Sequence, residues 1–244
     1  MHKNKQDQNQ IGYNEYGQAI GFPVTDWAGA SLPSRTCMDG RYVILKTVDS
    51  SDVCKSLFHA YCTDTRGTNW TYLPYGPFDT LAQFTQWFEK TCFASDPLFH
   101  VVKDKSTEKN IGIASYLRIS PALGSIEVGH IHFSPLLQRT PLATEAMYLM
   151  MHQVFEESGF RRYEWKCDAL NEPSKRAAMR LGFVYEGTFR QALTYKNRNR
   201  DTAWFSITDK EWPTLKEGFE LWLSEDNFDD AGLQRKTLLE CRGA

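Results

Sequence analysis

The segment Ser134–Thr140 is a candidate anion-binding loop. It follows a predicted strand, Ser125–Phe133, and precedes a predicted helix that begins at Pro141. A strand that leads through a short loop into a helix leaves several backbone N–H groups unpaired and exposes the positive end of the helix dipole. A phosphate group is stabilised at such a position. The sequence therefore predicts a phosphate-binding loop here.

Three side chains of the preceding strand are candidates for proton transfer. Glu127 lies between Ile126 and Val128, so its carboxylate points to the opposite face from these apolar neighbours. It can relay a proton directly or through water, or it can serve only as a solvated or ion-paired strand residue. His130 and His132 rank behind it as bases. Their spacing places both on one face of a strand, as a metal site requires, but the sequence offers no third ligand and we assign no metal.

Composition excludes several classes of function. Hydrophobic residues make up 41% and charged residues 24% of the 244-residue chain, as in ordinary globular proteins, and the net charge of -2 does not suit a nucleic-acid-binding protein. Apolar windows are short, so we expect no membrane span, and the polar start lacks a secretion signal. The six cysteines are scattered without metal-like spacing, which predicts reduced thiols in a cytoplasmic protein.

The predicted elements alternate strands with helices around this segment. Apolar periodicity and turn residues predict strands at 41–46, 98–103, 111–119, 125–133 and 162–168, helices after 49–51, 79–80, 141 and 171, and a final hairpin of strands 184–195 and 202–207 that turns at 196–201. This order indicates an α+β fold with one sheet between helices.

The two ends of the chain differ from this central part. Residues 1–40 are rich in polar and turn-forming residues, which predicts a disordered start and then an irregular arm held to the body by Phe22, Val24 and Trp27. Residues 41–213 would form the main domain, and residues 214–244 a C-terminal helical extension.

Three ordered motifs carry a resemblance to a known family. They are Glu127–Pro135, Gln138–Ala146, and Asn171–Ser174 followed by Leu181–Phe183 and Glu186-Gly187. Together they resemble the fourth strand, the phosphate loop and the Asn-x-x-Ser…Leu-Gly-Phe…Glu-Gly pattern of the GNAT superfamily of acyl-CoA N-acyltransferases. The similarity is greatest to the branch of ribosomal-protein N-terminal acetyltransferases and their small-amine-acetylating relatives.

The resemblance covers roughly residues 40–213. It implies a GNAT-like fold with a central mixed, mostly antiparallel sheet, and transfer of acetyl from acetyl-CoA to a primary amine by direct attack. Glu127 would then be the base. Many members carry a tyrosine acid where this chain has Ala178, and in the branch that this chain resembles Ser174 would act on the departing sulfur instead.

The resemblance also implies how acetyl-CoA is held. Backbone groups of Ile131, His132 and Phe133 would pair with the pantetheine arm, provided that neighbouring strands diverge there. The pyrophosphate and the rest of the cofactor would contact the following residues: Gln138, Arg139, Thr140, Leu142, Ala143, Thr144 and Asn171.

Two residues depart from the family's phosphate loop. Pro141 and Arg139 replace glycines, and proline removes one N–H donor. Proline is nevertheless favourable at the first helical position, with Thr140 as the N-cap. We therefore expect weakened rather than lost CoA binding, and Arg139 would add a charged contact.

The acceptor side is less defined. Trp70, Tyr72 and Tyr75 lie where relatives build the acceptor wall, although a satellite core is an equally good interpretation. The basic run Lys196–Arg200 suits a solvated hairpin tip, and Asp201 either caps a turn or binds the acceptor amine.

The acceptor itself stays open. A small-molecule amine and a protein N-terminus both fit, and a homodimer is common in such a family. The alternative function is a non-catalytic acyl-CoA-binding regulatory module with the same fold. The absence of the tyrosine and of the loop glycines favours this alternative.

Overall fold

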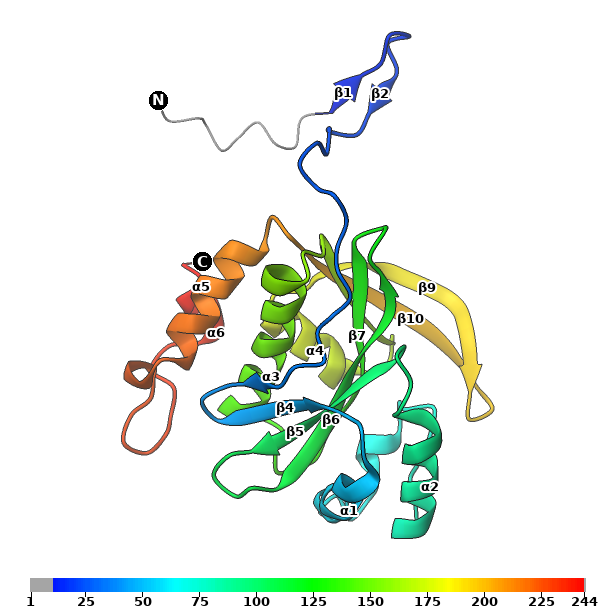
Figure 1. Cartoon of the computed structure of the whole chain (residues 1–244), viewed down its shortest axis with the longest axis vertical. Coiled ribbons are helices and arrows are strands. Elements are labelled where there is room, and N and C mark those ends of the chain that lie inside the picture. The colour runs from blue at the N-terminus through cyan, green and yellow to red at the C-terminus, as the bar shows by residue number, and fades with distance from the viewer. Residues whose placement is uncertain (1–10, 244) are drawn as a thin grey trace.

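A single large sheet organises the protein (Figure 1). The computed structural model describes residues 11–243. Its strands are β3 (Met38–Asp39), β4 (Val43–Thr47), β5 (Leu98–Asp104), β6 (Asn110–Ser120), β7 (Ser125–Phe133), β8 (Arg162–Asp168), β9 (Val184–Tyr195) and β10 (Arg198–Thr208). They lie in the order β3-β4-β5-β6-β7-β8-β10-β9, and β7–β8 is the parallel pair in an otherwise antiparallel sheet. The predicted α+β fold with a mixed, mostly antiparallel sheet is confirmed.

Helices cover both faces of the sheet. They are α1 (Cys54–Tyr61), α2 (Leu81–Thr91), α3 (Pro141–His152), α4 (Glu172–Leu181), α5 (Trp212–Leu223) and α6 (Leu238–Cys241), and a π-helical turn, Gln153–Glu157, prolongs α3. Side chains of Thr80, Thr140 and Asn171 cap α2, α3 and α4 by accepting backbone N–H groups of the first turn. These caps are worth about 1 kcal/mol each.

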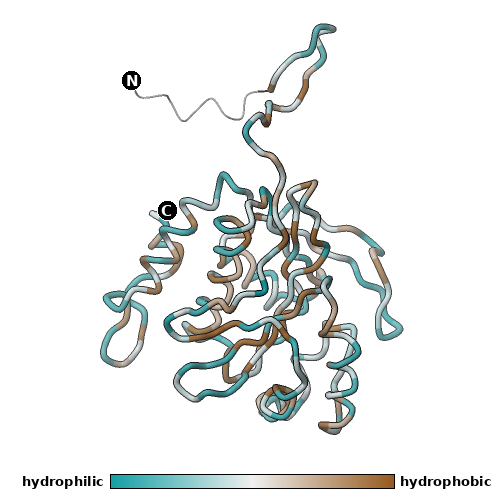
Figure 2. The backbone as a smooth tube through the Cα atoms, viewed as in Figure 1, coloured by the Kyte–Doolittle hydropathy of each residue, from teal (hydrophilic) through white to brown (hydrophobic). Residues whose placement is uncertain are grey.

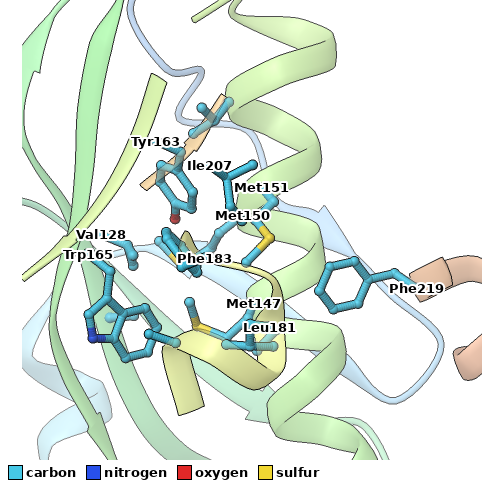
Figure 3. Close-up of a cluster of buried hydrophobic side chains, with 14 of the residues drawn as sticks. Val128, Met147, Met150, Met151, Tyr163, Trp165, Leu181, Phe183, Ile207 and Phe219 are labelled. Carbon is cyan, nitrogen blue, oxygen red and sulfur yellow. The ribbon is translucent and has the colours of Figure 1, made fainter. Parts of the chain in front are cut away.

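Apolar side chains form one core on each face, and Figure 2 shows the hydrophobic residues following the central strands. Figure 3 shows the larger core, in which methionines of α3 meet Val128 of β7, Tyr163 and Trp165 of β8, and Phe219 of α5. The second core is aromatic and joins α1 and α2 to β5 and β6. Its buried rings include Trp70, Phe84, Phe88 and Phe99.

A buried carboxylate fixes α3 against the start of β4. Glu145 is 4% exposed and accepts the backbone N–H groups of Arg41, Tyr42 and Val43 at 2.7, 2.7 and 2.8 Å. The lack of a side chain at Gly40 makes room for this carboxylate, because a Cβ there would lie 2.7 Å from a carboxylate oxygen of Glu145. The start of α3 is therefore held at a defined height on the sheet.

The arm differs from the predicted irregular chain by a small hairpin, β1 (Gly12–Tyr13) with β2 (Ala19–Ile20), which extends from the body (Figure 1). Trp27 holds the arm as expected, since its indole N–H donates to the Gly159 carbonyl at 3.0 Å. Lys210 lies over the Phe22 ring, with 3.7 Å between its ammonium and the ring centroid. Val24 is 44% exposed and does not hold the arm. The expected disordered start, residues 1–10, lies outside the described residues.

The predicted turn at 196–201 was too long. Lys196 and Asn197 alone connect β9 and β10, with φ of +48° and +57°. Two residues at positive φ form the tight turn that matches strand twist, and asparagine tolerates this conformation.

The C-terminal residues pack on α3 and α4. Trp212, Phe219 and Trp222 of α5 and Leu238 of α6 are buried in the larger core. Within residues 11–243, no helix is both long and apolar enough to cross a membrane.

Two buried histidines predict acid sensitivity. His100 and His132 are 0% and 2% exposed, and burial lowers their pKa values from 6.5 to about 4 and about 3. Below pH 6.5 these histidines therefore bind more protons in the unfolded chain than in the folded protein. Their contribution to the free energy of unfolding is fully present above this pH and is lost as pH falls towards the folded pKa values. We expect a loss of roughly 2 kcal/mol per histidine between pH 8 and pH 5, measured by urea unfolding.

His132→Phe should remove the share of His132, about 2 kcal/mol, whereas His152→Gln, a change at the partly exposed end of α3, should leave the loss intact. If the free energy of unfolding of the wild-type protein is equal at pH 8 and pH 5, the buried histidines are not the source of acid sensitivity.

Candidate functional site

The strands β7 and β8 stop pairing midway along their length. Residues Ser125–Val128 pair with Arg162–Trp165, whereas Lys166–Asp168 of β8 pair with β10 alone. β7 keeps its pairing with β6 through Phe133. The strand divergence that the predicted pantetheine contact requires is thus present from Gly129 onwards.

A β-bulge accompanies this divergence. Gly129 is opposite Ser115 and His132 is opposite Ile113, so His130 and Ile131 face a single residue of β6. His130 has φ of +49°. Bulges bend a strand and increase its twist. Neither His130 nor Ile131 has a register partner on β6, and neither pairs with β8. The edge of β7 that faces β8 is therefore unpaired beyond Val128, where an extended ligand could lie.

The loop before α3 has the geometry of an anion site. The Thr140 hydroxyl accepts the Ala143 N–H at 3.3 Å and donates to the Leu137 carbonyl at 2.6 Å. Within residues 11–243, the N–H groups of Arg139, Thr140 and Leu142 have no hydrogen-bond partner. Because Pro141 has no N–H, residues 139–143 have four backbone N–H groups; three are therefore available, and the cap uses that of Ala143.

Arg139 shows how the loop tolerates the loss of glycine. Its φ of +61° lies in the left-handed region, where glycine is at ease and an L-residue costs about 1–2 kcal/mol. The backbone keeps the glycine-like conformation, and the Arg139 side chain remains exposed.

Two other predicted contacts of the cofactor are bound to protein groups. The Gln138 amide donates to the Phe133 carbonyl at 2.8 Å and to Asn69 Oδ1 at 3.1 Å. Thr144 is buried, and its Oγ1 accepts from Arg180 at 3.1 Å. Sequence reasoning missed Arg180, because no local pattern indicates that the end of α4 reaches the first turn of α3.

Side chains of Ile131, Phe133, Leu142 and Ala143 pack against the larger core. These four residues can therefore offer a cofactor mainly their backbone. The His132 carbonyl already accepts the Tyr61 hydroxyl at 3.1 Å.

Glu127 lies in a row of buried charges. It is 3% exposed, and its Oε2 binds Lys166 Nζ at 2.8 Å and Arg118 at 2.7 Å. Lys166 also binds Glu164 at 2.7 Å and lies over the Trp204 ring, with its ammonium 3.7 Å from the centroid. Burial raises the pKa of Glu127, and the hydrogen bond and charge of Lys166 partly oppose this shift.

The structure shows Glu127 as an ion-paired strand residue, and its role as a base stays a prediction. The carboxylate is ion-paired, and its Oε1 is the oxygen with no hydrogen bond among the described residues. Leu117 packs over the neighbouring Gly129, at which a Cβ would lie 2.8 Å from a Leu117 methyl group. Lys166 was not among the predicted site residues. Its position could have been inferred from the alternation of side chains along β8, because Tyr163 and Trp165 face the core and Lys166 must therefore face the other side.

The two histidines of β7 stay neutral. His132 stacks on Tyr61 with 3.9 Å between ring centroids, and its lowered pKa of about 3 leaves it uncharged at neutral pH. His130 Nδ1 is 3.2 Å from the Tyr75 hydroxyl, and burial lowers its pKa to about 4.

Ser174 and Asn171 lie at the start of α4. The Trp165 indole N–H donates to Ser174 Oγ at 3.0 Å, and because an indole only donates, the serine hydroxyl keeps its own proton for another acceptor. Asn171 Oδ1 caps the Ser174 N–H at 3.2 Å, and within residues 11–243 its amide nitrogen has no partner. Capping and ligand binding by Asn171 are compatible, as expected.

The three aromatic residues of the predicted acceptor wall have different surroundings. Trp70 and Tyr75 belong to the second core, where Tyr75 lies 4.2 Å from Trp87 between ring centroids. The Tyr72 hydroxyl instead donates to the Leu170 carbonyl at 3.0 Å, beside Asn171.

The segment Asn69–Tyr72, which we call the bridging segment, also contacts the β9–β10 turn. Lys196 Nζ donates to the Trp70 carbonyl at 2.8 Å and Arg198 to the Thr71 carbonyl at 2.7 Å. The basic run is exposed as predicted, yet it is attached to the bridging segment. Asp201 accepts the Gln191 N–H at 2.7 Å within the hairpin.

Comparison with known proteins agrees with this architecture. The profile of the family described as acetyltransferase (GNAT) domain matches residues 43–184. A GCN5-related N-acetyltransferase from Brucella melitensis is 45% identical with a TM-score of 0.87, and the match covers 90% of this chain and 99% of that one. A probable acetyltransferase from Chromobacterium violaceum ATCC 12472 is 40% identical with a TM-score of 0.73, covering 78% and 95% of the two chains.

The ribosomal-protein-serine acetyltransferase of Escherichia coli (strain K12) is 28% identical over 95 residues, which are 39% of this chain and 51% of the relative. The match thus spans about half the length of that curated protein.

A double-mutant cycle separates the two roles of Glu127. Glu127→Gln and Lys166→Met each leave a buried charge with fewer partners, so each should lower the free energy of unfolding by about 1–3 kcal/mol. The double variant removes both charges and should recover most of this loss. If Glu127 is the base, turnover stays about 10²-fold or more below wild type in the double variant. Turnover that returns together with stability would assign Glu127 a structural role.

Arg139→Gly tests the anion-binding loop. Glycine removes the strain at positive φ, so stability should rise by about 1 kcal/mol while the backbone donors stay in place. Loss of the guanidinium should weaken CoA binding about threefold to tenfold, as measured by calorimetry. Unchanged affinity would show that Arg139 contributes only its N–H.

Proposed function

The chain belongs to the GNAT acetyltransferase family, and from this premise we propose that it transfers acetyl from acetyl-CoA to a primary amine by direct attack. The acceptor would be a small-molecule amine or a protein N-terminus. The observation that carries the proposal is the coincidence of two open backbone sites at one end of β7. These are the edge of β7 beyond Val128, which does not pair with β8, and the unpaired N–H groups at the start of α3.

The proposed binding mode follows from the open groups. The pyrophosphate would accept hydrogen bonds from the N–H groups of Arg139, Thr140 and Leu142, where the α3 dipole also favours negative charge. The pantetheine arm would extend along Ile131, with the Asn171 amide nitrogen as a further donor.

The proposed chemistry requires one base and one acid. The amine must lose a proton as its nitrogen attacks the thioester carbon, and Glu127, whose pKa is raised by burial, would accept this proton through water. As the carbon–sulfur bond breaks, the departing sulfur would take a proton from the Ser174 hydroxyl. The serine would regain a proton from water, and the Glu127 carboxyl would release its own proton to water, so both side chains return to their starting state. Both the acetylated amine and CoA thiol are then neutral at the reacting atoms.

One observation favours the alternative of a non-catalytic acyl-CoA-binding module. Glu127 is ion-paired with Arg118 and Lys166, and Leu117 packs over Gly129 beside it. The Glu127 carboxylate is therefore not directly exposed. A panel of amines separates the two functions, because a module binds CoA but releases no thiol with any acceptor.

We expect thiol release from acetyl-CoA with at least one amine of such a panel, and an acetylated product of matching mass. Ser174→Ala should lower kcat about 10²-fold without changing CoA affinity, and Ser174→Thr, which keeps a hydroxyl, should retain most activity. Binding of CoA without turnover on every amine would overturn the proposal in favour of the module.

A further inference from the structure

A depression with two cations lies beside the proposed acetyl-transfer site. It has a volume of about 390 Å³ and is lined by Gly67, Trp70, Thr71, Pro77, Lys196 and Arg198. The charged groups come from the β9–β10 turn (Lys196) and the first residue of β10 (Arg198), and the remaining wall is the loop between α1 and α2.

The positions of the two cations are fixed by neutral groups. Lys196 and Arg198 donate to the carbonyls of Trp70 and Thr71, and within residues 11–243 neither forms an ion pair with a carboxylate. An ammonium has three N–H donors and a guanidinium five, so each side chain has donors left. The pKa of Lys196 is lowered by burial and by the Arg198 charge, as expected where positive charge is not neutralised.

The depression adjoins the proposed cofactor site through Trp70. The Trp70 ring contacts the His132 ring, with 3.9 Å between centroids, and His132 lies on the part of β7 that has separated from β8. Tyr72, two residues further, binds the Leu170 carbonyl next to Asn171.

We propose that Lys196 and Arg198 select acceptor amines that also carry an anionic group, a phosphate or a carboxylate, which binds in this depression while the amine reaches the thioester. The inference rests on the proposed amine acetylation and names the chemical class of its acceptor. Two adjacent cations with spare donors match the several oxygens of either anion.

The test compares matched amines that differ by one charged group. Phosphoethanolamine is paired with ethanolamine, and β-alanine and γ-aminobutyrate with their amides. We expect kcat/KM for at least one anionic amine to exceed that for its neutral partner by tenfold or more. Comparison of phosphoethanolamine with the two amino acids identifies the preferred anion. Comparison of β-alanine with γ-aminobutyrate identifies the preferred distance between the amine and the carboxylate.

Variants assign the preference to the depression. Arg198→Glu and Lys196→Gln should remove the preference and leave kcat/KM for the neutral partner within about twofold of wild type. Arg190→Gln, a change of an exposed arginine on β9 outside the depression, should keep the preference. Equal losses for charged and neutral amines in Arg198→Glu would show that Arg198 only holds the loop.

The outcomes distinguish this inference from the proposed function. Turnover of neutral amines with no preference for anionic ones overturns the acceptor class and leaves acetyl transfer intact. If no amine is acetylated, the proposed function fails, and calorimetry of phosphoethanolamine and β-alanine with the CoA-bound protein still decides the inference. Binding that is lost in Arg198→Glu supports it, and absence of binding overturns it.

Discussion

The structure depends on β7 being unable to pair fully with both of its neighbours. Up to Val128 it bonds to β6 and β8, but the bulge at His130 and Ile131 bends it while β8 continues along β10. A backbone polar group left without a partner is costly once water is excluded. An extended ligand with amide groups would repair this deficit by acting as an additional strand. The proposed binding site thus depends on the incomplete pairing of the sheet. The helix that follows then contributes its own unpaired N–H groups at the same end.

The charges beside this opening obey a second constraint. Strand alternation turns Val128 and Trp165 towards the larger core, and it therefore turns Glu127, Glu164 and Lys166 to the other face. Burial of any one of these charges alone would be expensive, but together they compensate one another. A carboxylate held in this way keeps a raised pKa without losing its position. If Glu127 is the proposed base, the same side chain would support the fold and accept a proton.

Local signals in the sequence account for the elements that frame the site. Strands 125–133 and 162–168 matched their predicted bounds, since apolar and β-branched residues end there at turn formers, and the caps Thr140 and Asn171 follow from residue type. Contacts between distant segments had no such signal. Arg180 on Thr144, Gln138 on Asn69, and Lys196 on Trp70 join residues 36, 69 and 126 positions apart. The ion pairs of Glu127 likewise depend on the register of three strands, which no single segment encodes.

The bridging segment has a consequence for how the two halves of the site communicate. It is tied to the loop before α3 through Gln138, to the start of α4 through Tyr72, and to the hairpin through its carbonyls. A group that orders the loop on one side therefore reduces the conformational entropy that remains to be lost on the other side. Such thermodynamic linkage is reciprocal, so each of two co-substrates would tighten the binding of the other by the same factor. Cooperativity of this kind needs no domain movement. It needs only a short segment of chain that contacts both binding sites.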